Sequence, residues 1–183
     1  MKGIVFTEFL ELVEDKFGLE MVDRIINQST LESGGAYTTV GTYSFSEMLQ
    51  LVTNLSSNTE IPVDDLLLIY GEHFFSVLES NYRSMLDMYK GPLDLLSSIE
   101  NHIHVEVRKL YPDAELPSFK VTHKTDDELV MIYSSSRAMH HFGLGLMNKT
   151  FEYFDSKAHI LLEKIEPDGT EVKFSIKKID EPG

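Results

Sequence analysis

The chain has 183 residues, of which 42% are hydrophobic and 25% charged, and this composition is that of an ordinary folded protein of one or two domains. Its 30 acidic and 16 basic residues give a net charge of -14, and the sequence shows no basic patch of the kind that nucleic-acid or membrane-surface binding requires. The absence of cysteine excludes disulfides, thiol nucleophiles, iron–sulfur clusters and cysteine zinc sites.

The first half of the chain carries apolar residues at helical spacing. Phe6, Leu10, Val13 and Phe17 form one such stripe, and a second short helix is expected over residues 19–26. The opening residues mix acids into this pattern and lack the continuous apolar core of a signal peptide, and no run approaches the ~20 apolar residues of a membrane span. The sequence therefore favours a cytoplasmic protein.

Turn and cap signals divide the rest of this helical half. Residues 29–43 are rich in Ser, Thr and Gly and predict a long loop, after which Ser44 and Glu47 have the spacing of a capping box. Pro62 is typical of the start of another helix. One further helix is expected over residues 93–110.

The second part of the chain has the period of strands. The predicted elements are strands at 118–125 and 128–134, a helix at 139–154, and a hairpin of strands at 158–166 and 171–179. We therefore predict an α+β fold, with a helical N-terminal lobe (about 1–60) packed on a lobe (about 61–183) made of a small antiparallel sheet and one long helix. No repeat or linker separates the lobes, so a single domain over 1–183 is expected.

The candidate metal ligands are the seven histidines, none of which belongs to an H-E-x-x-H pattern. His102 and His104 lie on the helix predicted over 93–110 but point roughly 200° apart. His104 shares its face with apolar residues, among them Leu93 and Leu96, whereas His102 has mixed neighbours, among them Leu95. A histidine among apolar residues is most often part of the core, so spacing alone leaves open whether either one binds a metal.

A second candidate site follows the strand predicted over 128–134. Alternate residues of an extended chain share a face, so Tyr133, Ser135 and Arg137 would present two hydroxyls and a guanidinium to one side. Such a group suits a carboxylate or phosphate of a ligand. Taken alone, the pattern favours a polar strand end that bonds its own turn.

His104, Pro117 thirteen residues later and the Tyr-x-Ser-x-Arg motif at 133–137 occur in the order and spacing of the haem-nitric oxide/oxygen-binding (H-NOX) family, which the chain resembles over essentially its whole length. The resemblance selects His104 over His102. It implies haem b enclosed between the lobes, with His104 as the single axial and metal ligand. It further implies that Tyr133, Ser135 and Arg137 bind the propionates and that Pro117 presses on the porphyrin.

The resemblance also predicts the distal face of the haem. Oxygen-binding members carry a tyrosine nine residues after the first residue of the Tyr-x-Ser-x-Arg motif, where this chain has Phe142. By similarity, Phe9 and Phe74 replace the other polar distal residues, and Leu146 also lines the haem. We therefore expect a wholly apolar distal pocket, which favours NO because bound oxygen, unlike NO, needs a hydrogen-bond donor.

The function implied by the resemblance is a ferrous-haem sensor of NO, which also binds CO and has no catalytic activity of its own. NO bound opposite His104 would weaken the Fe–His bond, release the His104 helix and relax the haem against Pro117. The chain has no room for an output module, so the expected partner is a separate histidine kinase or cyclic-di-GMP enzyme, with no nucleic acid or membrane involved. The alternatives are an oxygen-binding haem protein, a peroxidase-like haem enzyme, and a cofactor-free interaction module.

Overall fold

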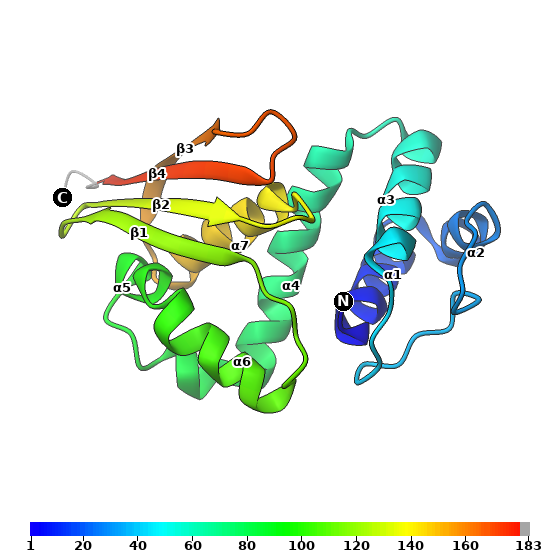
Figure 1. Ribbon diagram of the computed structural model, residues 1–183, viewed down its shortest axis with the longest axis horizontal. Coiled ribbons are helices and arrows are strands. Elements are labelled where there is room, and N and C mark those ends of the chain that lie inside the picture. The colour runs from blue at the N-terminus through cyan, green and yellow to red at the C-terminus, as the bar shows by residue number, and fades with distance from the viewer. Residues whose placement is uncertain (180–183) are drawn as a thin grey trace.

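The computed structural model describes residues 1–179 of the chain. Figure 1 shows a helical N-terminal part beside a small sheet that is flanked by further helices. The helices are α1 (Gly3–Phe17), α2 (Leu19–Asn27), α3 (Phe45–Thr59), α4 (Val63–Leu86), α5 (Pro92–Ser97), the π-helical turn η1 (Ile99–Ile103), α6 (His104–Leu110) and α7 (His140–Tyr153). The strands are β1 (Ser118–Lys124), β2 (Glu128–Ser134), β3 (Lys157–Lys164) and β4 (Glu171–Ile179). The predicted α+β fold is confirmed.

The four strands form one antiparallel sheet in the order β1-β2-β4-β3. Its buried face alternates as a half-buried strand should, with Leu129, Met131 and Tyr133 on β2 and Phe174 on β4 turned inward. Met147 and other apolar residues of α7 complete this core, so α7 lies between the sheet and α4. Within residues 1–179 no helix is long and apolar enough to cross a membrane.

The helical part has a core of its own. The inward face of α1 carries Phe6 and Val13, as expected, but Phe9 is also fully buried, whereas Leu10 and Phe17 lie only at the margin. This core includes residues from the first half of α4, and the second half of α4 contributes to the core of the sheet. Because α4 belongs to both cores, it connects the two parts; the single domain with lobes meeting near residue 60 stays a prediction.

The capping box expected at the start of α3 is wrong. Ser44 does cap the helix, since its hydroxyl accepts from the Ser46 amide, but the Glu47 carboxylate does not return to Ser44. It accepts hydrogen bonds from the hydroxyls of Ser33 (2.5 Å) and Tyr37 (2.7 Å) in the preceding loop. Burial would raise the pKa of Glu47, but these donors outweigh it and lower that pKa. A buried carboxylate therefore ties the long loop to α3.

Helices α4 and α7 touch backbone to backbone. A Cβ placed on Gly145 would lie 2.2 Å from the carbonyl oxygen of Leu68, and one on Gly71 would lie 2.1 Å from the carbonyl oxygen of Phe142. Neither neighbour is a side chain that can rotate away, so this approach requires glycine on both helices.

We expect Gly145→Ala to lower the free energy of unfolding by about 1–3 kcal/mol, because the added methyl must push the two backbones apart. Gly143→Ala on the same helix is the matched control. Its Cβ would meet only the Phe119 ring at 3.7 Å, so helix propensity should make it neutral or stabilising by up to about 1 kcal/mol. Urea unfolding followed by circular dichroism measures both, and equal stabilities of the two variants would contradict the close contact.

Candidate functional site

His104 begins α6 directly after the π-helical turn, so the single regular helix predicted over 93–110 is wrong. The amide of Ile103 donates to the carbonyl of Ser98, five residues back, at 3.3 Å. The extra residue in this turn shifts the faces that a regular helix would keep in line. Leu95, which was expected beside His102 among mixed neighbours, is as buried as Leu93 and Leu96.

The Glu100 carboxylate orients the His104 imidazole, and the sequence interpretation missed it. Nδ1 of His104, which is 7% exposed, lies 3.2 Å from Oε1 of Glu100, and the Phe119 amide donates to the same oxygen at 2.7 Å. With Nδ1–H directed at a carboxylate, Nε2 is the nitrogen left to bind a metal. The four-residue spacing of Glu and His on a helix was the signal that could have found this pair.

Burial lowers the pKa of His104, and the Glu100 charge offsets this only in part. The imidazole is therefore neutral at pH 7, the form that binds a metal. His102 has a different partner, since its Nδ1 shares a hydrogen bond with the Tyr89 hydroxyl at 2.5 Å. The two histidines that spacing could not separate thus have distinct surroundings.

The Tyr-x-Ser-x-Arg residues come together through a turn. Strand β2 ends at Ser134, and the carbonyl of Ser135 accepts from the amide of Ala138 at 3.2 Å, with Ala138 in the left-handed region (φ 49°). The prediction that Tyr133, Ser135 and Arg137 share one face of an extended chain is therefore wrong, because the chain is not extended beyond Ser134.

The turn nevertheless gathers these three side chains. The Arg137 amide donates to the Ser135 hydroxyl at 3.2 Å, and the Met139 amide donates to the buried Tyr133 hydroxyl at 3.0 Å. Burial raises the pKa of Tyr133, while Ser135 and the charge of Arg137 act against that rise. Two hydroxyls and a guanidinium therefore lie within electrostatic reach of one another.

The Arg137 guanidinium is bound to Glu115. It donates to the backbone carbonyl at 2.7 Å and to the carboxylate at 2.5 Å, and its side chain is 15% exposed whereas that of Glu115 is 83% exposed. Burial and then the charge of Arg137 lower the pKa of the Met1 α-amino group. Arg137 is thus a group that already binds a carboxylate in this structure.

The three phenylalanines assigned to the distal face gather around a tyrosine that the sequence interpretation missed. Ring centroids of Phe9, Phe142 and Phe74 lie 5.3, 4.9 and 5.9 Å from that of Tyr70. The fully buried Tyr70 hydroxyl donates to the carbonyl of Val5 at 2.5 Å. The cluster is therefore aromatic but not wholly apolar, and its one hydroxyl proton already has an acceptor.

Phe119, which the sequence interpretation did not single out, has its ring centroid 6.1 Å from that of His104 and 5.4 Å from that of Tyr133. The remaining predicted residues lie nearby in the sequence or the fold. On α7, Phe142 packs against the core of the helical part and Leu146 against that of the sheet. Pro117 is half-buried directly before β1.

These residues fit the haem that the sequence resemblance implies. A buried neutral imidazole held by a carboxylate suits one axial bond to iron. The guanidinium and two hydroxyls suit the propionates, since Arg137 binds a carboxylate here already. The aromatic cluster suits a flat apolar ring.

Comparison with known proteins finds one matching family and several similar structures. Residues 2–162 match the family described as haem-NO-binding. The unliganded Fe(II) H-NOX protein of K. algicida is 70% identical, with a TM-score of 0.97 and coverage of 99% of this chain and 98% of that chain. The H-NOX of Shewanella woodyi, in the Fe(II)CO state with IWP-051 bound, is 38% identical, with a TM-score of 0.82 and coverage of 98% and 95%.

Longer proteins are also similar to this chain. The soluble guanylate cyclase gcy-35 of Caenorhabditis elegans is 27% identical over 143 residues, which is 75% of this chain but 20% of that protein. The guanylate cyclase 89Db of Drosophila melanogaster is 26% identical over 88% of this chain and 25% of its own length. The chain thus spans about a fifth to a quarter of the curated relatives it matches.

We expect Glu100→Gln to weaken haem retention by roughly 10–100-fold, because it replaces the charged acceptor at Nδ1 of His104. The haem dissociation rate measures this effect, and the Fe–His stretching frequency of the ferrous protein should fall with it. Glu106→Gln is the control, since that carboxylate pairs with Lys109 at 2.6 Å on the outside of α6. The control should release haem at the wild-type rate. If Glu100→Gln does so too, Glu100 has no part in retaining the haem.

Proposed function

Because this chain belongs to the haem-NO-binding (H-NOX) family, we propose that it is a ferrous-haem sensor of NO that passes its signal to another protein. H-NOX domains are haem-binding sensor domains and not catalysts, and we extend this to the present chain. The observation that carries the proposal is the buried, neutral His104 with Nδ1 held by Glu100. Haem b, held by His104, would supply the iron that binds NO or CO.

We propose that Tyr133, Ser135 and Arg137 bind the propionates of the haem. Arg137 would donate to a propionate, either in place of its present acceptor Glu115 or in addition to it. One carboxylate would thus replace or join another. The exchange costs little because Glu115 is largely exposed and is readily solvated when released. Tyr133 and Ser135 add hydroxyl donors beside the same guanidinium.

Selection of NO over oxygen rests on the aromatic cluster. Phe142 and its neighbours Phe9 and Phe74 offer no hydrogen-bond donor. Tyr70 has one, but its proton goes to the Val5 carbonyl, and withdrawing it would leave a buried acceptor unpaired. The S. woodyi H-NOX binds CO, a ligand that needs no donor either, and this supports CO binding here.

Release of His104 from iron is the event that we propose as the signal. His104 is joined through Glu100 to β1, and α6 leads into Asp113, which pairs with Lys2 of the helical part at 2.9 Å. A shift of α6 therefore reaches both parts of the protein. We propose a histidine kinase or a cyclic-di-GMP enzyme as the recipient, and the net charge of -14 favours a basic surface on it.

His104→Gly tests the proximal assignment. We expect this variant to lose haem unless free imidazole is supplied, because it lacks the Nε2 that binds iron. His102→Ala is the control and should retain haem with the wild-type ferrous spectrum, since His102 contacts Tyr89 instead. Haem content after gel filtration, with and without imidazole, measures both, and the opposite pattern would assign the iron to His102.

Spectra of the ferrous protein in air, under CO and under NO test the distal assignment. We expect complexes with CO and NO and no stable complex with oxygen. Phe142→Tyr should introduce measurable oxygen affinity by adding a donor, whereas Phe142→Leu should not. A stable oxygen complex of the unmutated protein would refute the selectivity argument and favour the oxygen-binding alternative.

A further inference from the structure

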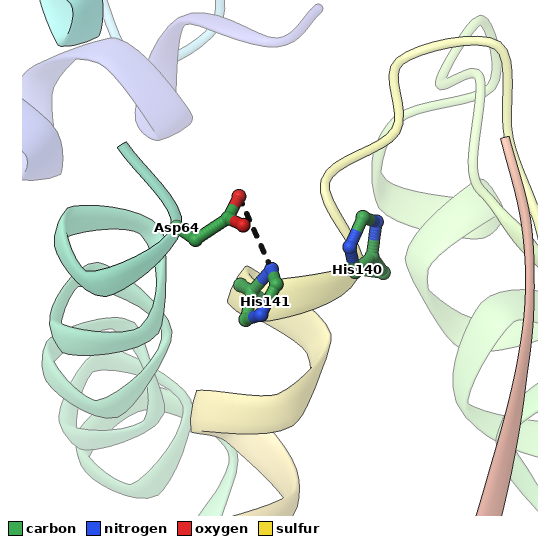
Figure 2. A group of neighbouring side chains, drawn as sticks. All are labelled: Asp64, His140 and His141. Carbon is green, nitrogen blue, oxygen red and sulfur yellow. Dashed lines mark ion pairs between the residues drawn. The ribbon is translucent and has the colours of Figure 1, made fainter. Parts of the chain in front are cut away.

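Two histidines and an aspartate lie together outside the proposed haem site. His140 and His141 begin α7, and Asp64 lies in the first turn of α4. One ligand atom from each, two imidazole nitrogens and a carboxylate oxygen, lie within 4.8 Å of one another. Figure 2 shows the Asp64 carboxylate extending from α4 toward His141, with the His140 ring on the far side of His141.

Neither ring nitrogen of His140 makes a hydrogen bond of regular geometry, although the residue is only 3% exposed and the Gly169 backbone lies beside its ring. Buried polar groups without a partner are uncommon and ask for an explanation such as an ion or a ligand. Nδ1 of His141 likewise makes no regular hydrogen bond, and its nearest acceptor is Oδ1 of Asp64 at 3.3 Å. The three groups therefore approach one another without satisfying one another.

The protonation state of His140 suits a metal. Burial lowers the pKa of this histidine, and the neighbouring His141 and Lys164 lower it further, against smaller opposing effects of Asp64 and the Gly169 backbone. The imidazole is thus neutral at pH 7 and needs to lose no proton before it binds a cation. The carboxylate of Asp64 supplies the negative charge that offsets part of the charge of the ion.

We propose that Asp64, His140 and His141 form a site for a divalent transition-metal ion of the Zn²⁺ type. Two imidazoles with one carboxylate match the ligands that Zn²⁺ accepts, and a water would complete four-coordination. Mg²⁺ and Ca²⁺ are poor candidates because they prefer oxygen ligands. The site shares no residue with the proposed haem site and does not depend on the proposed function.

The metal would join the start of α4 to the start of α7. These two helices already meet at Gly71 and Gly145 farther along, so an ion at their ends would fix a second point of contact. His141 directly precedes Phe142, whose ring belongs to the aromatic cluster. Binding of the ion would therefore hold the segment of α7 that carries Phe142.

The test uses untagged, haem-loaded protein that is stripped with a chelator, dialysed against micromolar Zn²⁺ and then analysed for zinc per haem. We expect one zinc per protein in the wild type and close to none in Asp64→Asn and His141→Asn. These two are exposed or half-buried positions, so the variants should fold and keep the wild-type haem spectrum. His159→Asn, at an exposed histidine of β3, is the control and should keep its zinc.

Thermal unfolding gives a second measurement. Zn²⁺ should raise the Tm of the wild type and of His159→Asn, because an ion that binds only the folded state stabilises it. The Tm of Asp64→Asn and of His141→Asn should not change when Zn²⁺ is added. The proposal is overturned if the wild type retains no zinc. It is equally overturned if Asp64→Asn and His141→Asn retain as much zinc as the wild type.

Discussion

The contact between α4 and α7 is the constraint on which the rest of the molecule depends. Only glycine at Gly71 and Gly145 lets the two backbones approach to the distance seen here. Helix α4 contributes to the core of the helical part and to the core of the sheet, and α7 lies against both. Their close packing therefore sets where Phe142 lies relative to Tyr70, and with it the shape of the aromatic cluster.

A second constraint is the Glu100 carboxylate, which orients the imidazole of His104. Glu100 accepts from the Phe119 amide and lies at the Nδ1 of His104, so it joins the π-helical turn to β1 through the residue that orients the imidazole. The cost of holding this partly buried charge is offset by two donors at one oxygen. The arrangement couples His104 to the sheet as well as to its own helix, and the proposed signal from iron would use this coupling.

Three buried polar groups of the described chain differ in how they are satisfied. Glu47 accepts from loop hydroxyls, Tyr70 has a single acceptor, and neither ring nitrogen of His140 makes a hydrogen bond of regular geometry. The hydrogen bonds of Glu47 and Tyr70 are structural, because they hold a loop and an aromatic ring in place. The third remains unexplained by the fold alone, and this contrast separates the Asp64–His140–His141 group from an ordinary buried polar contact.

Local patterns in the sequence determined most of the elements and the fold class, because periodicity, caps and turns depend on residues that are near one another along the chain. The strand Glu128–Ser134 and the helix that begins after Pro62 were predicted in this way. The motif of His104, Pro117 and Tyr-x-Ser-x-Arg likewise identified the family, which the family match over residues 2–162 confirms.

Only the tertiary structure decided which side chains meet. The partners of Glu47 lie 14 and 10 residues away along the chain, and those of Tyr70 and Arg137 lie 65 and 22 residues away. The π-helical turn before His104 inserts a residue that no apolar repeat records, and it shifted the predicted faces. Asp64 and His141 meet because two helices cross at glycines, since a distance between elements follows from their packing and not from the spacing within either one.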